Sequence, residues 1–278
     1  MSQVTTLLKQ YLFVLASLVL LSACSSKSNQ NAKQAALYFG AGTQSLMDQQ
    51  YTDALNSLLK ANELDPKNSE ILNNLGMAYY FKGEKELAIK HLNLSLEYNE
   101  NNSDAKQNLA SIYFKDGNLK NAEKLYKEVL RDLTYDKQAR TLYNLGMIEI
   151  QNKNNLAAED YFQKSIKEDE NYCPSYFQIG LLKYNQRQFN KALRNFKEAT
   201  QGLCTNSPIA HYYQGLSLTE LRRFDDARIK FDEIESRFKK SIYAIKSRNK
   251  IVELNDLEAR HKTEESHATR KVLESPEF

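Results

Sequence analysis

The sequence predicts an all-α protein in which six helix–turn–helix repeats stack into a solenoid. Two observations support this prediction: a small residue is followed twelve positions later by alanine at six places, and these places recur every 34 to 36 residues. Repeats of this kind bury their apolar faces only against their neighbours, so a regular array forms one continuous core. The six pairs are Gly42 and Ala54, Gly76 and Ala88, Ala110 and Ala122, Gly146 and Ala158, Gly180 and Ala192, and Gly215 and Ala227.

Each repeat is set to begin seven residues before its small residue and then spans 34 residues. The small residue falls on the first helix (helix A) and the alanine on the second (helix B), so we expect the pair to let the two backbones approach closely. Turn-forming residues at 82–84 and 116–118 separate the two helices, and Pro66 ends helix B of the first repeat. The predicted repeats are 35–68, 69–102, 103–136, 139–172, 173–206 and 208–241.

This register resembles the tetratricopeptide-repeat family over about three quarters of the chain. The departures are Ala110 in place of glycine and short insertions at 137–138 and 207. The resemblance implies a right-handed superhelix in which the A helices line a concave groove that binds protein segments. An unrelated helical bundle is the alternative, but such a bundle has no reason to keep a 34-residue register.

The residues after the last repeat predict a cap and then a tail. A solenoid needs a final helix to cover its last apolar face, and Ile242, Ile245, Val252 and Leu254 predict such a helix over 242–257. From about residue 258 the chain is polar, which predicts a disordered tail over 258–278.

The N-terminus predicts export and lipid anchoring. Lys9 precedes an uncharged apolar run at 11–21, which suits a signal peptide over 1–23 and is short of the ~20 residues of a membrane span. The run ends in Leu21-Ser22-Ala23-Cys24, which resembles the bacterial lipobox and implies lipidation of Cys24. Ser25, by analogy with lipoprotein sorting, favours the periplasmic face of the outer membrane. An ordinary signal peptide with a coincidental cysteine is the alternative, and residues 24–34 predict a flexible tether.

Composition and motifs predict a binding protein, with no enzymatic activity, cofactor or metal. Lysine and arginine number 38 against 35 aspartates and glutamates, and the interleaved charges do not indicate a nucleic-acid partner. None of the four histidines lies in a metal or nucleophile motif, and no phosphate loop or nucleophile elbow is present. Cys204 and His211 lack the further ligands that a zinc site needs.

Cys173 and Cys204 predict a disulfide. Cys173 begins helix A of the fifth repeat and Cys204 follows its helix B, so antiparallel helices place both on the same side of the repeat. Disulfides persist in oxidising compartments such as the periplasm. Two buried free thiols are the alternative.

The family resemblance also implies which side chains face the groove. These positions form an apolar trough rich in methionine and aromatic residues, which adapts to apolar ligands and suits an amphipathic helix or extended segment. Packing between neighbouring repeats is the alternative role. The predicted groove residues are Met77, Tyr80, Phe81, Phe114, Tyr143, Met147, Phe177, Leu181, Tyr184 and Tyr212.

The junction between the third and fourth repeats, residues 130–146, carries a more specific resemblance. Its tyrosines and arginines precede Asn144-Leu145-Gly146, which is similar to type IV pilus biogenesis lipoproteins of the PilF/PilW type. That resemblance implies a pilotin, which escorts the secretin subunit to the outer membrane and supports its assembly. The alternatives are a general periplasmic scaffold for envelope assembly and an accessory subunit of a cell-wall enzyme.

Overall fold

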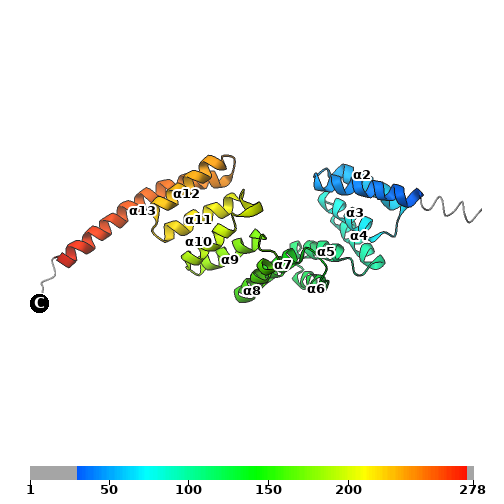
Figure 1. Cartoon of the computed structure of the whole chain (residues 1–278), viewed down its shortest axis with the longest axis horizontal. Coiled ribbons are helices and arrows are strands. Elements are labelled where there is room, and N and C mark those ends of the chain that lie inside the picture. The colour runs from blue at the N-terminus through cyan, green and yellow to red at the C-terminus, as the bar shows by residue number, and fades with distance from the viewer. Residues whose placement is uncertain (1–29, 274–278) are drawn as a thin grey trace, which may run out of the picture. The chain divides into compact units, whose positions relative to one another are not determined.

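The computed structural model describes residues 30–273 and is helical throughout, apart from turns and connections (Figure 1). This confirms the predicted all-α class. The predicted signal peptide, 1–23, and the predicted lipidation site, Cys24, lie outside the described residues. Helical residues 30–47 come first, and the α-helices that follow are α2 (Tyr51–Leu64), α3 (Ser69–Phe81), α4 (Lys85–Tyr98), α5 (Ser103–Lys115), α6 (Leu119–Val129), α7 (Gln138–Gln151), α8 (Asn155–Glu168), α9 (Cys173–Asn185), α10 (Phe189–Glu198), α11 (Pro208–Glu220), α12 (Phe224–Arg237) and α13 (Ile242–Leu273), with a 3-10 turn η1 (Gly202–Cys204) after α10.

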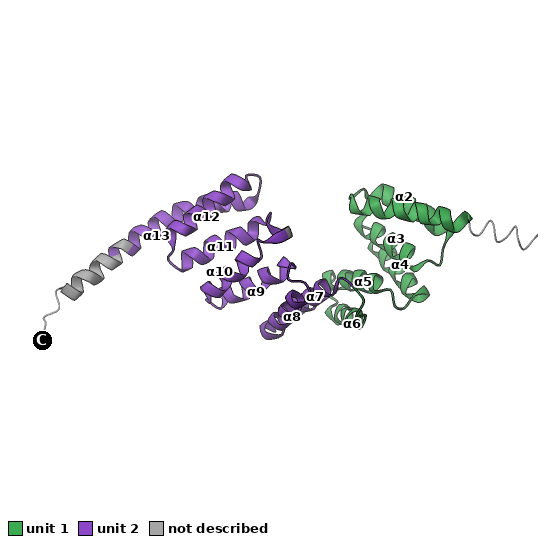
Figure 2. Ribbon diagram, in the orientation of Figure 1, with its two compact units in different colours: residues 1–135 green, residues 136–278 purple. Residues whose placement is uncertain are grey.

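The chain divides into two compact units between Tyr135 and Asp136 (Figure 2). The N-terminal unit contains residues 30–47 and α2 to α6, and the C-terminal unit contains α7 to α13. Within each unit, helix A packs on helix B of its own repeat and helix B packs on helix A of the next, as in α3–α4–α5 and α7–α8–α9. This alternation lets each apolar face be covered by its neighbour in sequence.

Close packing inside each repeat explains why helix A carries a small residue. A Cβ built on Gly180 would lie 2.5 Å from the ring of Phe196, sixteen positions later, and one on Gly76 would lie 2.9 Å from Leu92 Cγ and 3.1 Å from the Ala88 carbonyl oxygen. The predicted approach of backbones is therefore only part of the reason. The small residue mainly makes room for the large side chain four positions after the alanine.

The turns between helix A and helix B share one backbone feature. The residue seven positions after each small residue has a φ between 57° and 87°, in the left-handed region. Only two of the six are glycine, the residue that adopts this region without steric cost. The six are Gln49, Gly83, Gly117, Lys153, Arg187 and Arg222.

Helix α13 is longer than the sequence predicted. Its buried face comprises Ala244 and Leu254 with half-buried Tyr243 and Ile251, whereas Ile242, Ile245 and Val252 are exposed. The predicted cap therefore buries Leu254 as expected, but the other three residues expected on its packing face point to solvent. A continuation past 257 brings Glu258 within 3.0 Å of Arg228 Nη2.

The prediction of disorder is wrong for residues 258–273, which belong to α13. This segment contains no glycine or proline, and its alanine, glutamate, lysine and arginine residues have high helix propensity. Polar composition predicts disorder, but a helix can be polar on every side when it continues from a packed segment. Residues 274–278 lie outside the described part of the chain.

Candidate partner-binding surface

The predicted groove residues lie on the A helices of both units. We call the side chains three and two positions before and one, four and five positions after each small residue the A-helix face. On this face in the N-terminal unit, Met77, Tyr80 and Phe114 are half-buried and Phe81 is 46% exposed. Phe81 stacks on Tyr51 of α2 with ring centroids 4.7 Å apart. These side chains are thus packed on one side and open on the other.

Amide side chains run along the A helices of the N-terminal unit. Asn74 Nδ2 donates to Thr43 Oγ1 at 2.8 Å, and Asn73 Nδ2 donates to Asn74 Oδ1 at 3.0 Å. Asn108 Nδ2 then donates to Asn73 Oδ1 at 2.9 Å. This amide chain links three successive A helices and gives the face a polar stripe.

The C-terminal unit has aromatic residues at the corresponding positions. The residue three positions before each glycine is aromatic, and its ring centroid lies 5.7 Å from that of the phenylalanine sixteen positions after the glycine, in all three repeats. Aromatic pairs at this spacing add to the stabilisation from burial. The pairs are Tyr143 with Phe162, Phe177 with Phe196, and Tyr212 with Phe231.

Aromatic rings form a cluster around Phe177. Tyr213 belongs to this cluster, although it is not among the groove residues predicted from the sequence. Its ring centroid lies 5.8 Å from Phe177 and from Tyr184, and 5.3 Å from Phe196. Tyr213 is two positions before Gly215, the register that Asn74 occupies in the N-terminal unit, so comparison of the repeats at this position could have found it. Phe177, Tyr184 and Tyr213 are half-buried, as are Leu181 of α9 and Met147 of α7.

Tyr212 is a correction to the predicted groove. It is only 9% exposed, because Tyr243 of α13 packs on it with ring centroids 5.4 Å apart. The final helix covers the position that remains open in the earlier repeats. Tyr212 therefore belongs to the core around Phe231 and Leu254 and is not available to a partner in this structure.

Burial keeps the hydroxyls of Tyr143 and Tyr184 uncharged at ordinary pH. Burial, helped by the charge of Glu220, raises the pKa of Tyr184 to about 12. Burial also raises the pKa of Tyr143, against the opposing effect of its hydrogen bond from Gln178. These hydroxyls can therefore act as neutral hydrogen-bond donors and acceptors beside apolar rings, which suits a partner that presents an apolar side chain and backbone groups.

The C-terminal unit also contains the two cysteines, which are joined by a disulfide with their Cα atoms 6.2 Å apart. The bond ties the start of α9 to η1, within the long connection 199–207. His211 lies nearby and is buried, with Nε2 3.1 Å from the Thr205 carbonyl oxygen. Burial is the main reason that the pKa of His211 is lowered. Both features fix a connection; neither lies on the A-helix face.

In residues 30–273, no group of three histidine, cysteine, aspartate or glutamate side chains is placed to hold a metal ion. No helix in this part of the chain is both long and apolar enough to cross a membrane.

Comparison with family models identifies the repeats. Models described as "Tetratricopeptide repeat" match residues 69–102, 103–167 and 177–241, and a "TPR repeat" model matches 48–83. Together these matches take in more than half of the chain.

Individual known proteins are also similar to this chain in sequence. The chain is 24% identical to the type IV pilus assembly protein PilF of Pseudomonas aeruginosa, over 64% of this chain and 70% of that protein. It is 33% identical to the photosystem I assembly protein Ycf3 of Rippkaea orientalis, over 45% of this chain and 76% of that protein.

Solved structures share the fold. A structure of Pseudomonas aeruginosa PilF matches with a TM-score of 0.69 at 18% identity, covering 80% of this chain and 99% of PilF. PilW, a type IV pilus biogenesis factor, matches with a TM-score of 0.65 at 16% identity, covering 75% of this chain and 96% of PilW. The predicted resemblance is thus confirmed in sequence for PilF and in fold for PilF and PilW, and the chain belongs to the tetratricopeptide-repeat family.

Proposed function

We propose that this protein is a lipid-anchored scaffold of type IV pilus biogenesis that binds the outer-membrane secretin subunit through its A-helix face. The observation that carries the proposal is the sequence similarity to a type IV pilus assembly protein over 70% of that protein's length. The same chain carries Leu21-Ser22-Ala23-Cys24, the lipobox-like sequence that favours an anchor at the periplasmic face of the outer membrane.

The aromatic side chains of the C-terminal unit are the best-suited contact residues. Phe177, Tyr184 and Tyr213 form one half-buried cluster with both apolar surface and hydroxyl groups. Aromatic residues with two side-chain torsions lose little conformational entropy on binding, and they are enriched at the sites that dominate binding energy. The acyl chains would hold this surface close to the membrane in which the secretin assembles.

Binding of the purified secretin subunit to the soluble repeat region, residues 30–278, tests the proposed contact. We expect saturable binding that Phe177→Ala with Tyr143→Ala weakens at least tenfold. Absence of binding by the wild-type protein would refute the secretin assignment. Anchoring is tested separately by labelling cells with radioactive palmitate: label should enter the wild-type chain and not Cys24→Ser, and an unlabelled wild type would refute the lipid anchor.

A second candidate is a general assembly scaffold for envelope proteins or for a cell-wall enzyme. The similarity to Ycf3, whose name describes an assembly role for an unrelated complex, favours this broader reading. The two candidates differ in their partner. Crosslinking in cells at the A-helix face should yield secretin under the first and barrel-assembly or cell-wall proteins under the second.

A further inference from the structure

The segment 236–252, which joins the end of α12 to the start of α13, carries charge of only one sign. It contains six lysine and arginine residues and no aspartate or glutamate, although the whole chain is nearly balanced at 38 basic and 35 acidic residues. Acidic and basic residues interleave on an ordinary solvated helix face, whereas a concentration of one sign attracts the opposite sign. The six residues are Arg237, Lys239, Lys240, Lys246, Arg248 and Lys250.

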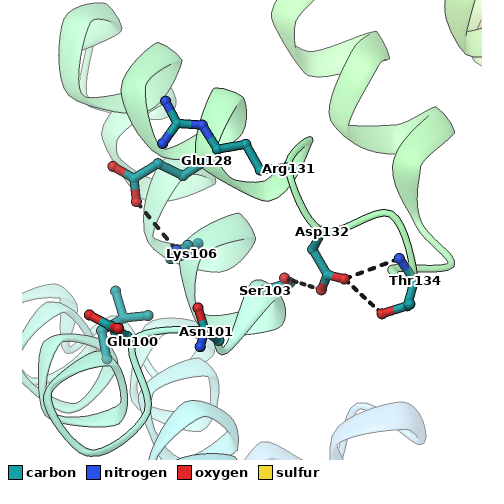
Figure 3. Close-up of a pocket in the computed structure, with 9 residues that line it drawn as sticks. Glu100, Asn101, Ser103, Lys106, Glu128, Arg131, Asp132 and Thr134 are labelled. Atoms are coloured by element: carbon teal, nitrogen blue, oxygen red, sulfur yellow. Dashed lines mark hydrogen bonds and ion pairs between the residues drawn. The ribbon is translucent and has the colours of Figure 1, made fainter.

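The cavity beside the connection 130–137 shows the more usual compensation of charge. In Figure 3, Lys106 and Glu128 form an ion pair of 3.4 Å, and Asp132 Oδ2 accepts a hydrogen bond from Ser103 Oγ at 2.6 Å. Opposite charges lie close together there, so this cavity does not indicate a charged partner. The charged residues of its lining are Glu100, Lys106, Glu128, Arg131 and Asp132.

Three of the six basic side chains of segment 236–252 have no acidic partner within residues 30–273: Lys239, Lys240 and Lys246. The first two are exposed in the turn before α13, and Lys246 is exposed one turn into the helix, with Nζ 5.3 Å from the ring centroid of Tyr243. Lysines just before a helix oppose its dipole, so stabilisation of the fold does not account for them. The paired residues are Arg237 with Glu233, Arg248 with Glu235, and Lys250 with Glu253.

Exposed apolar side chains lie at the same end of α13. Ile242, Ile245 and Val252 are 57%, 54% and 63% exposed. Their spacing of three and seven residues places them along one side of the helix, roughly opposite the buried Ala244. Lys246, four positions after Ile242, borders the same side. This end of α13 therefore presents apolar and basic side chains together to solvent.

We infer that this part of the protein binds the surface of an anionic phospholipid membrane. Anionic headgroups attract the unpaired lysines, and the exposed apolar side chains leave water for the boundary between headgroups and acyl chains. A nucleic acid or an acidic protein also offers negative charge, but it gives the three apolar side chains no comparable environment. We call the surface the α13 outer face; it comprises Lys239, Lys240, Ile242, Ile245, Lys246 and Val252.

The contact is peripheral, because no helix in residues 30–273 is long and apolar enough to cross a membrane. It goes beyond the proposed function, since it requires neither the secretin nor acyl chains on Cys24. It gives the C-terminal unit its own attachment to a membrane. The lipobox-like sequence Leu21-Ser22-Ala23-Cys24 on the same chain independently favours a protein that works at a membrane surface.

Cosedimentation of residues 30–278 with lipid vesicles tests the inference without acyl chains, because this region lacks Cys24. The vesicles are phosphatidylcholine alone or an equimolar mixture of phosphatidylcholine and phosphatidylglycerol. We expect the wild type to bind the mixed vesicles at least tenfold more tightly, and added salt to weaken this binding because it screens exposed charges. Absence of binding to the mixed vesicles would refute the inference and leave the secretin proposal, which is tested without lipid, as it stands.

Two variants separate the charged and apolar contributions. The charge variant is Lys239→Gln with Lys240→Gln and Lys246→Gln, and the apolar variant is Ile242→Gln with Ile245→Gln and Val252→Gln. All six residues are exposed and glutamine has high helix propensity, so circular dichroism should show unchanged helicity. The matched controls replace exposed residues elsewhere with glutamine: Lys90, Lys120 and Lys124 in one, and Leu37, Leu156 and Ile229 in the other.

We expect the charge variant to bind the mixed vesicles at least tenfold more weakly than the wild type, the apolar variant at least threefold more weakly, and both controls as the wild type does. A folded charge variant with wild-type affinity, or equal losses in the controls, would refute the α13 outer face. If only the charge variant loses affinity, the surface recognises charge alone, as for a nucleic acid or an acidic protein, and the membrane assignment is overturned.

Discussion

The two units carry the same repeat frame but different A-helix faces. In the N-terminal unit the amide chain from Thr43 to Asn108 crosses the A helices, whereas in the C-terminal unit Tyr143 and Phe177 occupy the register of Asn73 and stack on the phenylalanines of their repeats. The difference shows that the contact between helix A and helix B sets the frame. The residues beside that contact can be polar or aromatic without changing the frame. The kind of partner that the A-helix face suits changes with them.

The disulfide should cause the largest difference in stability between the two units. It closes a loop of 32 residues, with a sequence separation of 31, and a loop of that size is worth about 3–4 kcal/mol in the chain-entropy model. Cys173→Ser with Cys204→Ser should therefore lower the free energy of unfolding of the C-terminal unit by that amount. Urea unfolding followed by hydrogen exchange would locate the loss. Mass mapping of the isolated protein without reduction is the control, and two alkylated free thiols would contradict the bond.

Glycine-to-alanine substitutions test whether the helix A–helix B contact is tighter in the C-terminal unit than in the N-terminal unit. In the C-terminal unit, Gly180→Ala places a Cβ 2.5 Å from the buried Phe196 ring, so we expect a loss of about 2–3 kcal/mol. Gly76→Ala meets Leu92 at 2.9 Å and should cost about 1–2 kcal/mol. The measurement is chemical denaturation of each variant.

The control for these substitutions is Gly83→Ala, at a turn. A Cβ there meets nothing within 4 Å, but its φ of 87° is unfavourable for alanine, which predicts about 1–2 kcal/mol from backbone strain alone. Equal losses for Gly180→Ala and Gly76→Ala would contradict this prediction. They would show that the helix A–helix B contact is no tighter at Phe196 than at Leu92.

The histidines predict a smaller, pH-dependent effect in each unit. Burial lowers the pKa of His91 and of His211 below the usual 6.5. At acidic pH the unfolded chain then binds protons more readily than the folded one. The contribution of these histidines to the free energy of unfolding is therefore complete above pH 6.5, and it is lost as the pH falls through their pKa values in the folded protein. His211→Gln should reduce this loss for the C-terminal unit only. Unfolding midpoints at pH 7.5 and 5.5 would check it, and an unchanged pH dependence in His211→Gln would contradict the assignment.

The repeat register could be predicted because it depends on short-range spacing within the sequence. The same spacing did not reveal that Lys153, Arg187 and Arg222 adopt left-handed turns, since these residues carry no glycine signal. The geometry of the turn between two packed helices imposes that backbone conformation. Tertiary packing overrides local preference at these three positions.

The candidate site was only partly predictable for a related reason. Burial of Tyr212 depends on α13, whose packing face and length follow from contacts such as Tyr243 on Tyr212 and Glu258 with Arg228. The link between Asp132 and Ser103 joins residues 29 positions apart. No local pattern encodes such pairs, so the sequence pointed to the junction without showing how it is held.

We propose that the aromatic side chains on the A-helix face of the C-terminal unit form the partner-binding surface. The most direct test is the affinity of the secretin subunit for Tyr143→Ala with Phe177→Ala, compared with Tyr98→Ala with Tyr161→Ala, which removes two tyrosines from the B helices α4 and α8. We predict at least a tenfold loss for the first variant, about 1.4 kcal/mol, and wild-type affinity for the second, with helicity retained in both. Equal affinities in two folded variants would contradict the claim and place the contact elsewhere on the protein.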